Sequence, residues 1–74
     1  MNNLKKERNR LGLTQLEAAK QAGISYSMYT KMESGIKDPS MDTMKKIAKM
    51  YKRSVDYLFF DPSTTESEFE EVKA

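Results

Sequence analysis

LTQLEAAKQAGISYSMYTKMESG, residues 13–35, is the stretch that decides the fold of this chain. Each of its halves opens with a helix start. Thr14 and Glu17 form an S/T-x-x-E capping box, and Ser25 is a typical N-cap for a second helix. Gly23 falls between them, where a helix ends and glycine readily adopts a left-handed backbone conformation. The stretch therefore predicts two short helices joined by a tight turn.

Three further helices are predicted around this pair. Asn3 is expected to cap a first helix over residues 3–11, and Ser40 to cap a fourth helix. A short fifth helix is expected over residues 54–59. No segment alternates apolar and polar residues as a half-buried strand does. The chain is therefore predicted to be all-α.

Charge divides the chain near residue 61. Residues 1–60 carry 12 Lys and Arg against 6 Asp and Glu, a net charge of +6, whereas residues 61–74 carry a net charge of −4. A basic body suggests a polyanionic partner, although an ordinary solvated surface accounts for it about as well. We expect one domain over residues 1–61, followed by an acidic C-terminal tail over residues 62–74. The tail is expected to be either a short helix or disordered.

The composition excludes several classes of function. The chain has no cysteine and no histidine, so thiolate chemistry, disulfides and the usual zinc ligands are absent. We expect no catalytic residues, no metal site and no cofactor. The protein is therefore not expected to be an enzyme. No apolar run approaches the ~20 residues that span a bilayer. We expect a cytoplasmic protein with no membrane partner.

Residues 4–59 contain a set of residues in a characteristic order and spacing. The set is Arg8 and Gly12, LTQ at 13–15, Ala19, Gly23, Ile24 and Ser25, Glu33 to Gly35, Pro39, Ile47 and Ala48, and SVDYLF at 54–59. In this order and at these spacings, the chain resembles the phage repressor and Cro family of helix-turn-helix domains, also called the XRE type. The resemblance implies a compact five-helix, lambda-repressor-like DNA-binding domain whose helix-turn-helix is formed by helices two and three.

The resemblance also implies that helix three enters the major groove of DNA. Tyr29 and Met32 are expected to face inward and close the helix pair. Gln15 is expected to bind a phosphate at the start of helix two, and Lys31 can donate to guanine O6 and N7. The full set of expected DNA contacts is Gln15, Ser25, Tyr26, Ser27, Thr30, Lys31, Ser34 and Lys37.

Two further groups have other expected roles. In this family the positions of Arg8 and Glu33 form a partly buried ion pair between helix one and the end of helix three. The C-terminal end of the domain carries more aromatic surface than one short helix can bury, so a homodimer interface is expected there. Its expected residues are Val55, Tyr57, Phe59 and Phe60.

Some residues depart from the family pattern in ways that affect stability. Tyr29 stands where isoleucine or valine is usual and Ala18 where leucine is usual, which we interpret as compensating volumes. Glu7 replaces a usual apolar residue. Lys52 replaces the glycine that usually ends helix four, so a lysine in the left-handed conformation is expected. The core is also expected to use methionines to fill gaps, namely Met32, Met41 and Met44.

The predicted function is sequence-specific DNA binding by a transcriptional regulator, in the form of a repressor that binds an inverted-repeat operator as a dimer. Its expected partners are double-stranded DNA and a second copy of the chain, and no small-molecule effector is evident. The alternative is a helical protein-interaction module on the same fold, for example an antitoxin or antirepressor partner. Charge reversal at Lys31 separates the two, because only a DNA reader would lose operator affinity while keeping its fold.

Overall fold

The computed structural model describes residues 2–36 and 38–60. This part of the chain forms four α-helices and one π-helical turn, and it contains no strand. The elements are α1 (Leu4–Arg10), α2 (Gln15–Ala22), α3 (Tyr26–Ser34), α4 (Met41–Tyr51) and the turn η1 (Asp56–Phe60). The predicted all-α, five-helix fold is confirmed. None of the described helices has the length and apolar character needed to cross a membrane.

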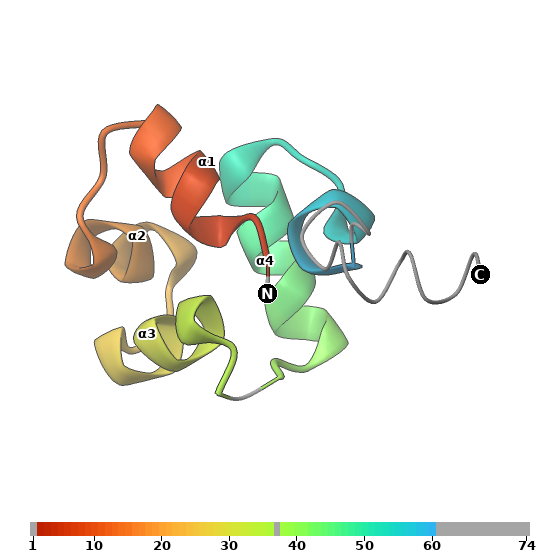
Figure 1. Cartoon of the computed structure of the whole chain (residues 1–74). Helices are drawn as coiled ribbons and strands as arrows, with labels where there is room; N and C mark the ends of the chain where they lie inside the picture. Colours follow the sequence, from red (N-terminus) through yellow and green to blue (C-terminus); the bar gives the residue numbers. More distant parts are fainter. Residues whose placement is uncertain (1, 37, 61–74) are drawn as a thin grey trace.

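α2 and α3 form a pair that lies beside α4 (Figure 1). α2 packs against both α3 and α4, and Figure 1 shows this pair on one side of α4 and η1 on the other. The start of the domain is tied to its end by two hydrogen bonds. The backbone N–H of Asn3 donates to the carbonyl of Leu58 at 2.9 Å, and Asn3 Nδ2 donates to the carbonyl of Tyr57 at 2.7 Å.

These bonds explain why the predicted capping role of the Asn3 side chain is wrong. Asn3 occupies the N-cap position of α1, but its side chain makes no capping hydrogen bond. Asn3 is buried, and its amide is engaged with η1 instead. The neighbouring Asn2 supplies the cap, because its Oδ1 accepts from the backbone N–H of Leu4 at 3.1 Å. The tertiary contact with η1 therefore outweighs the local preference of Asn3.

The other helix ends follow their local sequence. Thr14 forms the predicted capping box at the start of α2, and the hydroxyls of Ser25 and Ser40 cap α3 and α4. Gly23 ends α2 with a φ of 75°. Lys52 ends α4 with a φ of 57°, the left-handed conformation expected from its place in the pattern.

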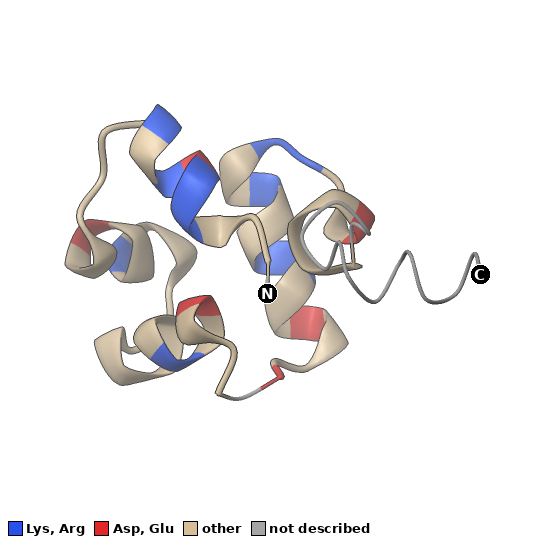
Figure 2. Ribbon diagram, in the orientation of Figure 1, with Lys and Arg blue, Asp and Glu red and all other residues tan. Residues whose placement is uncertain are grey.

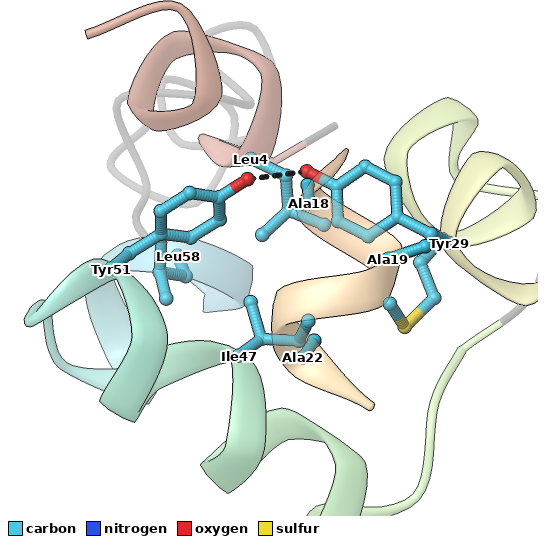
Figure 3. Close-up of a cluster of buried hydrophobic side chains, with 9 residues drawn as sticks. Leu4, Ala18, Ala19, Ala22, Tyr29, Ile47, Tyr51 and Leu58 are labelled. Carbon is cyan, nitrogen blue, oxygen red and sulfur yellow. Dashed lines mark hydrogen bonds between the residues drawn. The ribbon is translucent and has the colours of Figure 1, made fainter. Parts of the chain in front are cut away.

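The core joins small residues on α2 to large ones on α3 and α4. Figure 3 shows Ala18 and Ala22 facing the space that Tyr29, Tyr51 and Ile47 fill. Tyr29 and Tyr51 are fully buried, and their hydroxyl oxygens lie 2.6 Å apart. Together with these residues, the core contains Leu4, Ala19, Met32 and Leu58.

Two of the three expected core methionines are buried. Met32 and Met44 are 2% and 8% exposed, whereas Met41 is 54% exposed. The prediction for Met41 is wrong because the buried stripe of α4 begins one turn later. Met41 is the first residue of α4, and the buried positions of that helix are Met44, Ile47 and Tyr51.

Candidate nucleic-acid interface

The turn between α2 and α3 is fixed by backbone hydrogen bonds. The N–H of Gly23 donates to the carbonyl of Lys20 at 3.1 Å, and that of Ile24 donates to the carbonyl of Ala19 at 3.0 Å. This pattern ends a helix with a left-handed residue, which glycine adopts without a steric penalty. With Tyr29 buried on the inner side of α3, the opposite side of that helix faces outward.

The outward side of α3 carries five of the residues that are expected from the sequence to contact DNA. Tyr26 and Ser27 lie in the first turn, and Tyr26 is 51% exposed. Lys31 and Ser34 follow on later turns and are exposed, while Thr30 is half-buried. These side chains therefore form one surface that begins at the N-terminus of α3, the end that contacts bases in helix-turn-helix proteins.

Three hydroxyl groups at this surface already have hydrogen bonds inside the helix. Ser25 Oγ accepts from the backbone N–H three residues on, at 3.0 Å. The hydroxyls of Thr30 and Ser34 each donate to the carbonyl three residues earlier, also at 3.0 Å. The protons of Thr30 and Ser34 are thus directed into the helix. Their oxygens are left as acceptors, suited to a base amino group, and donation to a phosphate would require the hydroxyl to rotate.

Gln15 lies beside this surface and is held by a carboxylate. It is the first residue of α2, and its Nε2 donates to Glu33 Oε1 at 2.9 Å. Glu33 is also bound by Arg8, with 2.9 Å from Nε to Oε2 and 3.0 Å from Nη2 to Oε1. Arg8 and Glu33 therefore form a bidentate ion pair between α1 and α3. The remaining guanidinium nitrogen, Nη1, donates to the carbonyl of Leu13 at 3.0 Å.

The ion pair is shielded from solvent. The side chains of Arg8 and Glu33 are 13% and 6% exposed. Burial alone would raise the pKa of Glu33, but hydrogen bonds from Arg8, Gln15 and Tyr29 outweigh it and hold the pKa below its ordinary value of 4.5. The carboxylate is thus ionised at neutral pH, as a partner of an arginine and an amide N–H should be.

A shallow hollow joins Gln15 to the start of α3. Its lining residues are Arg8, Thr14, Gln15, Leu16 and Tyr26. The fold thus brings together Gln15 and Tyr26, two residues expected to bind DNA. It also brings in Leu16, which is 48% exposed and was not in the expected set. The position of Leu16 directly after Gln15 was the available clue in the sequence.

Basic residues are distributed unevenly over the described helices. Figure 2 shows most of the Lys and Arg on α1 and around α4, whereas Lys31 is the single basic residue of α3. No ion pair within the described residues involves Lys31, which leaves its ammonium available to an anion. Lys37, another expected DNA contact, lies outside the described residues, as does the expected acidic tail over residues 62–74.

The residues expected to form a dimer interface lie on and next to η1. Val55, Tyr57 and Phe59 are half-buried, and Phe60 is 56% exposed. Tyr57 is partly committed inside the monomer, because its hydroxyl donates to Glu7 Oε2 at 2.9 Å. Phe60 therefore offers the largest exposed apolar surface of this group.

Comparison with known proteins agrees with this architecture. A family model described as helix-turn-helix matches residues 4–58, which is most of the chain. The chain therefore belongs to the helix-turn-helix family, and its motifs are those of the XRE type.

Two curated relatives, both from Bacillus subtilis (strain 168), carry names in keeping with this class. The chain is 38% identical over 55 residues to the HTH-type transcriptional regulator ImmR, a match that covers 74% of this chain and 43% of ImmR. It is 42% identical over 57 residues to the uncharacterized HTH-type transcriptional regulator YqaF, covering 77% of this chain and 72% of YqaF. The match thus spans less than half of the first relative and most of the second.

Proposed function

We propose that this protein is a sequence-specific DNA-binding transcriptional regulator in which α3 reads bases and Gln15 binds the backbone. The observation that carries the proposal is the shared outward surface of Tyr26, Ser27, Thr30 and Lys31, with Gln15 beside it at the start of α2. A surface of this kind offers donors and acceptors to base edges at one end and an amide donor to a phosphate at the other. The names of the two relatives support the same class.

Selection of binding sites from random double-stranded DNA tests the proposal. We expect one enriched sequence whose affinity falls steeply with salt, because each neutralised phosphate releases counterions. Lys31→Glu should abolish selective binding while the thermal melt stays unchanged, since Lys31 is exposed. Lys49→Glu, the same charge reversal on α4, is the matched control and should retain selectivity. Absence of any enriched sequence would contradict the proposal and favour the alternative, a protein-interaction module.

The proposal includes a homodimer formed through η1. Phe60 presents exposed apolar surface beside the half-buried Phe59, with ring centroids 6.5 Å apart. A two-fold dimer would place two copies of α3 on half-sites about one helical turn, ~34 Å, apart. The enriched site should then be an inverted repeat.

Sedimentation of a Phe60→Glu variant tests the dimer. Because Phe60 is exposed, the variant should remain folded but sediment as a monomer and bind single half-sites more weakly than the parent binds a full site. Leu11→Glu is the matched control, since Leu11 is 41% exposed and follows the last residue of α1, whereas η1 contacts Asn3 and Glu7. A parent chain that stays monomeric both alone and on its selected site would overturn the dimer.

Repression is the proposed outcome of binding, by occupancy of an operator that overlaps a promoter. A reporter gene placed behind the selected site should fall in expression when the protein is supplied, and it should recover with Lys31→Glu. The expected cytoplasmic location is part of this proposal, because the protein must share a compartment with its DNA. Increased expression would identify an activator instead.

A further inference from the structure

The carboxylate of Glu33 is bound by four donors from three other side chains. Oε1 accepts from Arg8 Nη2 and Gln15 Nε2, and Oε2 accepts from Arg8 Nε and the Tyr29 hydroxyl, all at 2.9–3.0 Å. A carboxylate offers about four lone-pair sites. Every site of Glu33 is therefore taken, and the plane of the carboxylate is fixed.

Tyr51 extends this network into the core. The Tyr29 and Tyr51 oxygens are 2.6 Å apart, and both side chains are fully buried (Figure 3). Tyr29 has a single hydroxyl proton, which goes to Glu33, so its oxygen must accept the proton of Tyr51. The direction of donation is thus Tyr51 to Tyr29 to Glu33, and no described buried side-chain polar atom lacks a partner.

The same carboxylate decides how the amide of Gln15 is turned. An amide oxygen placed against a carboxylate would be repelled, so the amide must present its nitrogen to Glu33. One N–H of Nε2 is used in that bond, and the second N–H and Oε1 are left for another partner. Gln15 is half-buried and lines the hollow beside Tyr26, so its side chain lies next to the proposed DNA surface.

We propose that Glu33, Tyr29 and Tyr51 are positioning residues for DNA binding: their hydrogen-bonded chain holds the Gln15 amide with one N–H directed toward the DNA backbone before DNA arrives. The proposal rests on the proposed function and deepens it. Neither tyrosine can touch DNA, because both are fully buried. Their contribution is to prevent the carboxylate, and hence the amide, from turning, which lowers the ordering cost of binding.

Burial of the two phenols keeps the hydrogen bonds from Tyr51 to Tyr29 and from Tyr29 to Glu33 in place near neutral pH. Burial, helped by the adjacent Glu33 carboxylate, raises the pKa of Tyr29 well above its ordinary value, and burial also raises the pKa of Tyr51. Both hydroxyls therefore remain protonated donors near neutrality.

The first test uses the protein without DNA. In ¹⁵N NMR spectra, the Gln15 side-chain amide should show one proton shifted downfield and low mobility. Gln21, an exposed glutamine of the same helix, serves as internal control and should be mobile. Tyr29→Phe keeps the buried ring and removes only the hydroxyl, and it should increase the mobility of the Gln15 amide while the backbone spectrum stays dispersed. A Gln15 amide as mobile as that of Gln21, or one insensitive to Tyr29→Phe, would overturn the proposal.

The second test is a double-mutant cycle on the selected DNA site. Tyr29→Phe should weaken binding by about 3- to 10-fold, in the lower part of the range for residues coupled in one hydrogen-bond network, and Tyr51→Phe should weaken it by less. In a Gln15→Ala background, both losses should disappear, because the hydroxyls act through the glutamine. Equal losses in the two backgrounds would show a merely structural role and would overturn the proposal.

Ile47→Val is the matched control for stability. Ile47 is fully buried in the same core and takes no part in the hydrogen bonds, so the variant should melt earlier but keep its DNA affinity in both backgrounds. All affinities are compared at a temperature where every variant is folded. If the parent chain selects no DNA site, the proposed function fails, and the NMR measurement still shows separately whether the network orders Gln15.

Discussion

Tyr57 donates its hydroxyl to Glu7 Oε2 across 2.9 Å and thereby ties η1 to α1. The Glu7 side chain is 3% exposed, and its other oxygen is bound by Arg10 and lies 3.4 Å from Arg53 Nε. Glu7 stands at a position where the family usually has an apolar residue. The structure shows how a charge is accommodated there, because partners from three parts of the chain satisfy the carboxylate. The side-chain carboxylates of Glu7 and Glu33 are thus both shielded from solvent, with different partners.

Removal of the charge should cost more stability at Glu33 than at Glu7. Arg8 is 13% exposed and would be left buried without its counter-ion, whereas Arg10 and Arg53 are 41% and 42% exposed and can turn to water. We expect Glu33→Gln to lower the free energy of unfolding by about 3–5 kcal/mol and Glu7→Gln by about 1–3 kcal/mol. Urea unfolding of the two variants beside the parent measures the difference. Equal losses would show that the exposure of the arginine partner does not decide the cost.

Stability should fall in acid, and Glu33 should account for part of the fall. Hydrogen bonds and nearby arginines outweigh burial and hold the pKa of both Glu33 and Glu7 below the ordinary 4.5. The unfolded chain therefore takes up these protons first as the pH falls. The stabilisation is complete above the unfolded pKa and is lost as the pH drops through the folded pKa.

Urea unfolding across pH 7 to 2 tests this dependence. The free energy of unfolding should decline below about pH 4.5, the ordinary pKa of these glutamates, and the decline should be shallower for Glu33→Gln. The two curves will run parallel if Glu33 has the same pKa in both states, and that result would contradict the prediction.

Tyr29→Ile should destabilise the domain, and Ala18→Leu should restore part of the loss. Both positions are fully buried in one core, so the leucine can occupy volume that the tyrosine ring vacates. The rescue should remain partial because the isoleucine leaves Glu33 and Tyr51 without the hydroxyl between them. Thermal melts of the two single variants and the double variant test this interaction. Additive losses would mean that the volumes at these positions do not compensate.

Lys52→Gly should stabilise the domain modestly. Lys52 holds a φ of 57° at the end of α4, a conformation that strains a residue with a Cβ atom. Glycine adopts it without strain but loses more chain entropy on folding, so we expect a net gain of about 0.5–1 kcal/mol in the free energy of unfolding. Lys49→Gly, inside the same helix, is the control and should lose about 1 kcal/mol. A loss at Lys52 equal to the loss at Lys49 would contradict the strain at residue 52.

The sequence predicts the elements well where their ends depend on neighbouring residues. Thr14, Gly23, Ser25 and Lys52 behave as predicted because a cap is made by groups within a few residues of the helix end. Asn3 is the exception, since η1 engages its amide from 54 residues away. Met41 fails for a related reason: helical periodicity gives the face of a helix, but not where along its length the core begins.

Some features of the candidate site could likewise be predicted from the sequence, and others depend on tertiary packing. The outward placement of Tyr26, Ser27 and Lys31 follows from helical period once Tyr29 is inside. The position of Leu16 in the hollow beside Gln15 and Tyr26 does not, because it depends on the angle between α2 and α3.

The sequence by itself determined the helix pair, its turn and the family, because local caps, helical period and fixed spacings carry that information. The pairing of Arg8 with Glu33 was expected from the family, but only the tertiary structure decided that the Glu33 carboxylate also binds Gln15 and Tyr29, and that Tyr51 completes the network. These side chains come from four helices, and their hydroxyl, amide and guanidinium groups meet only when those helices pack. The physical reason is that a buried carboxylate must be fully hydrogen-bonded, and its donors are chosen by proximity in space rather than in sequence.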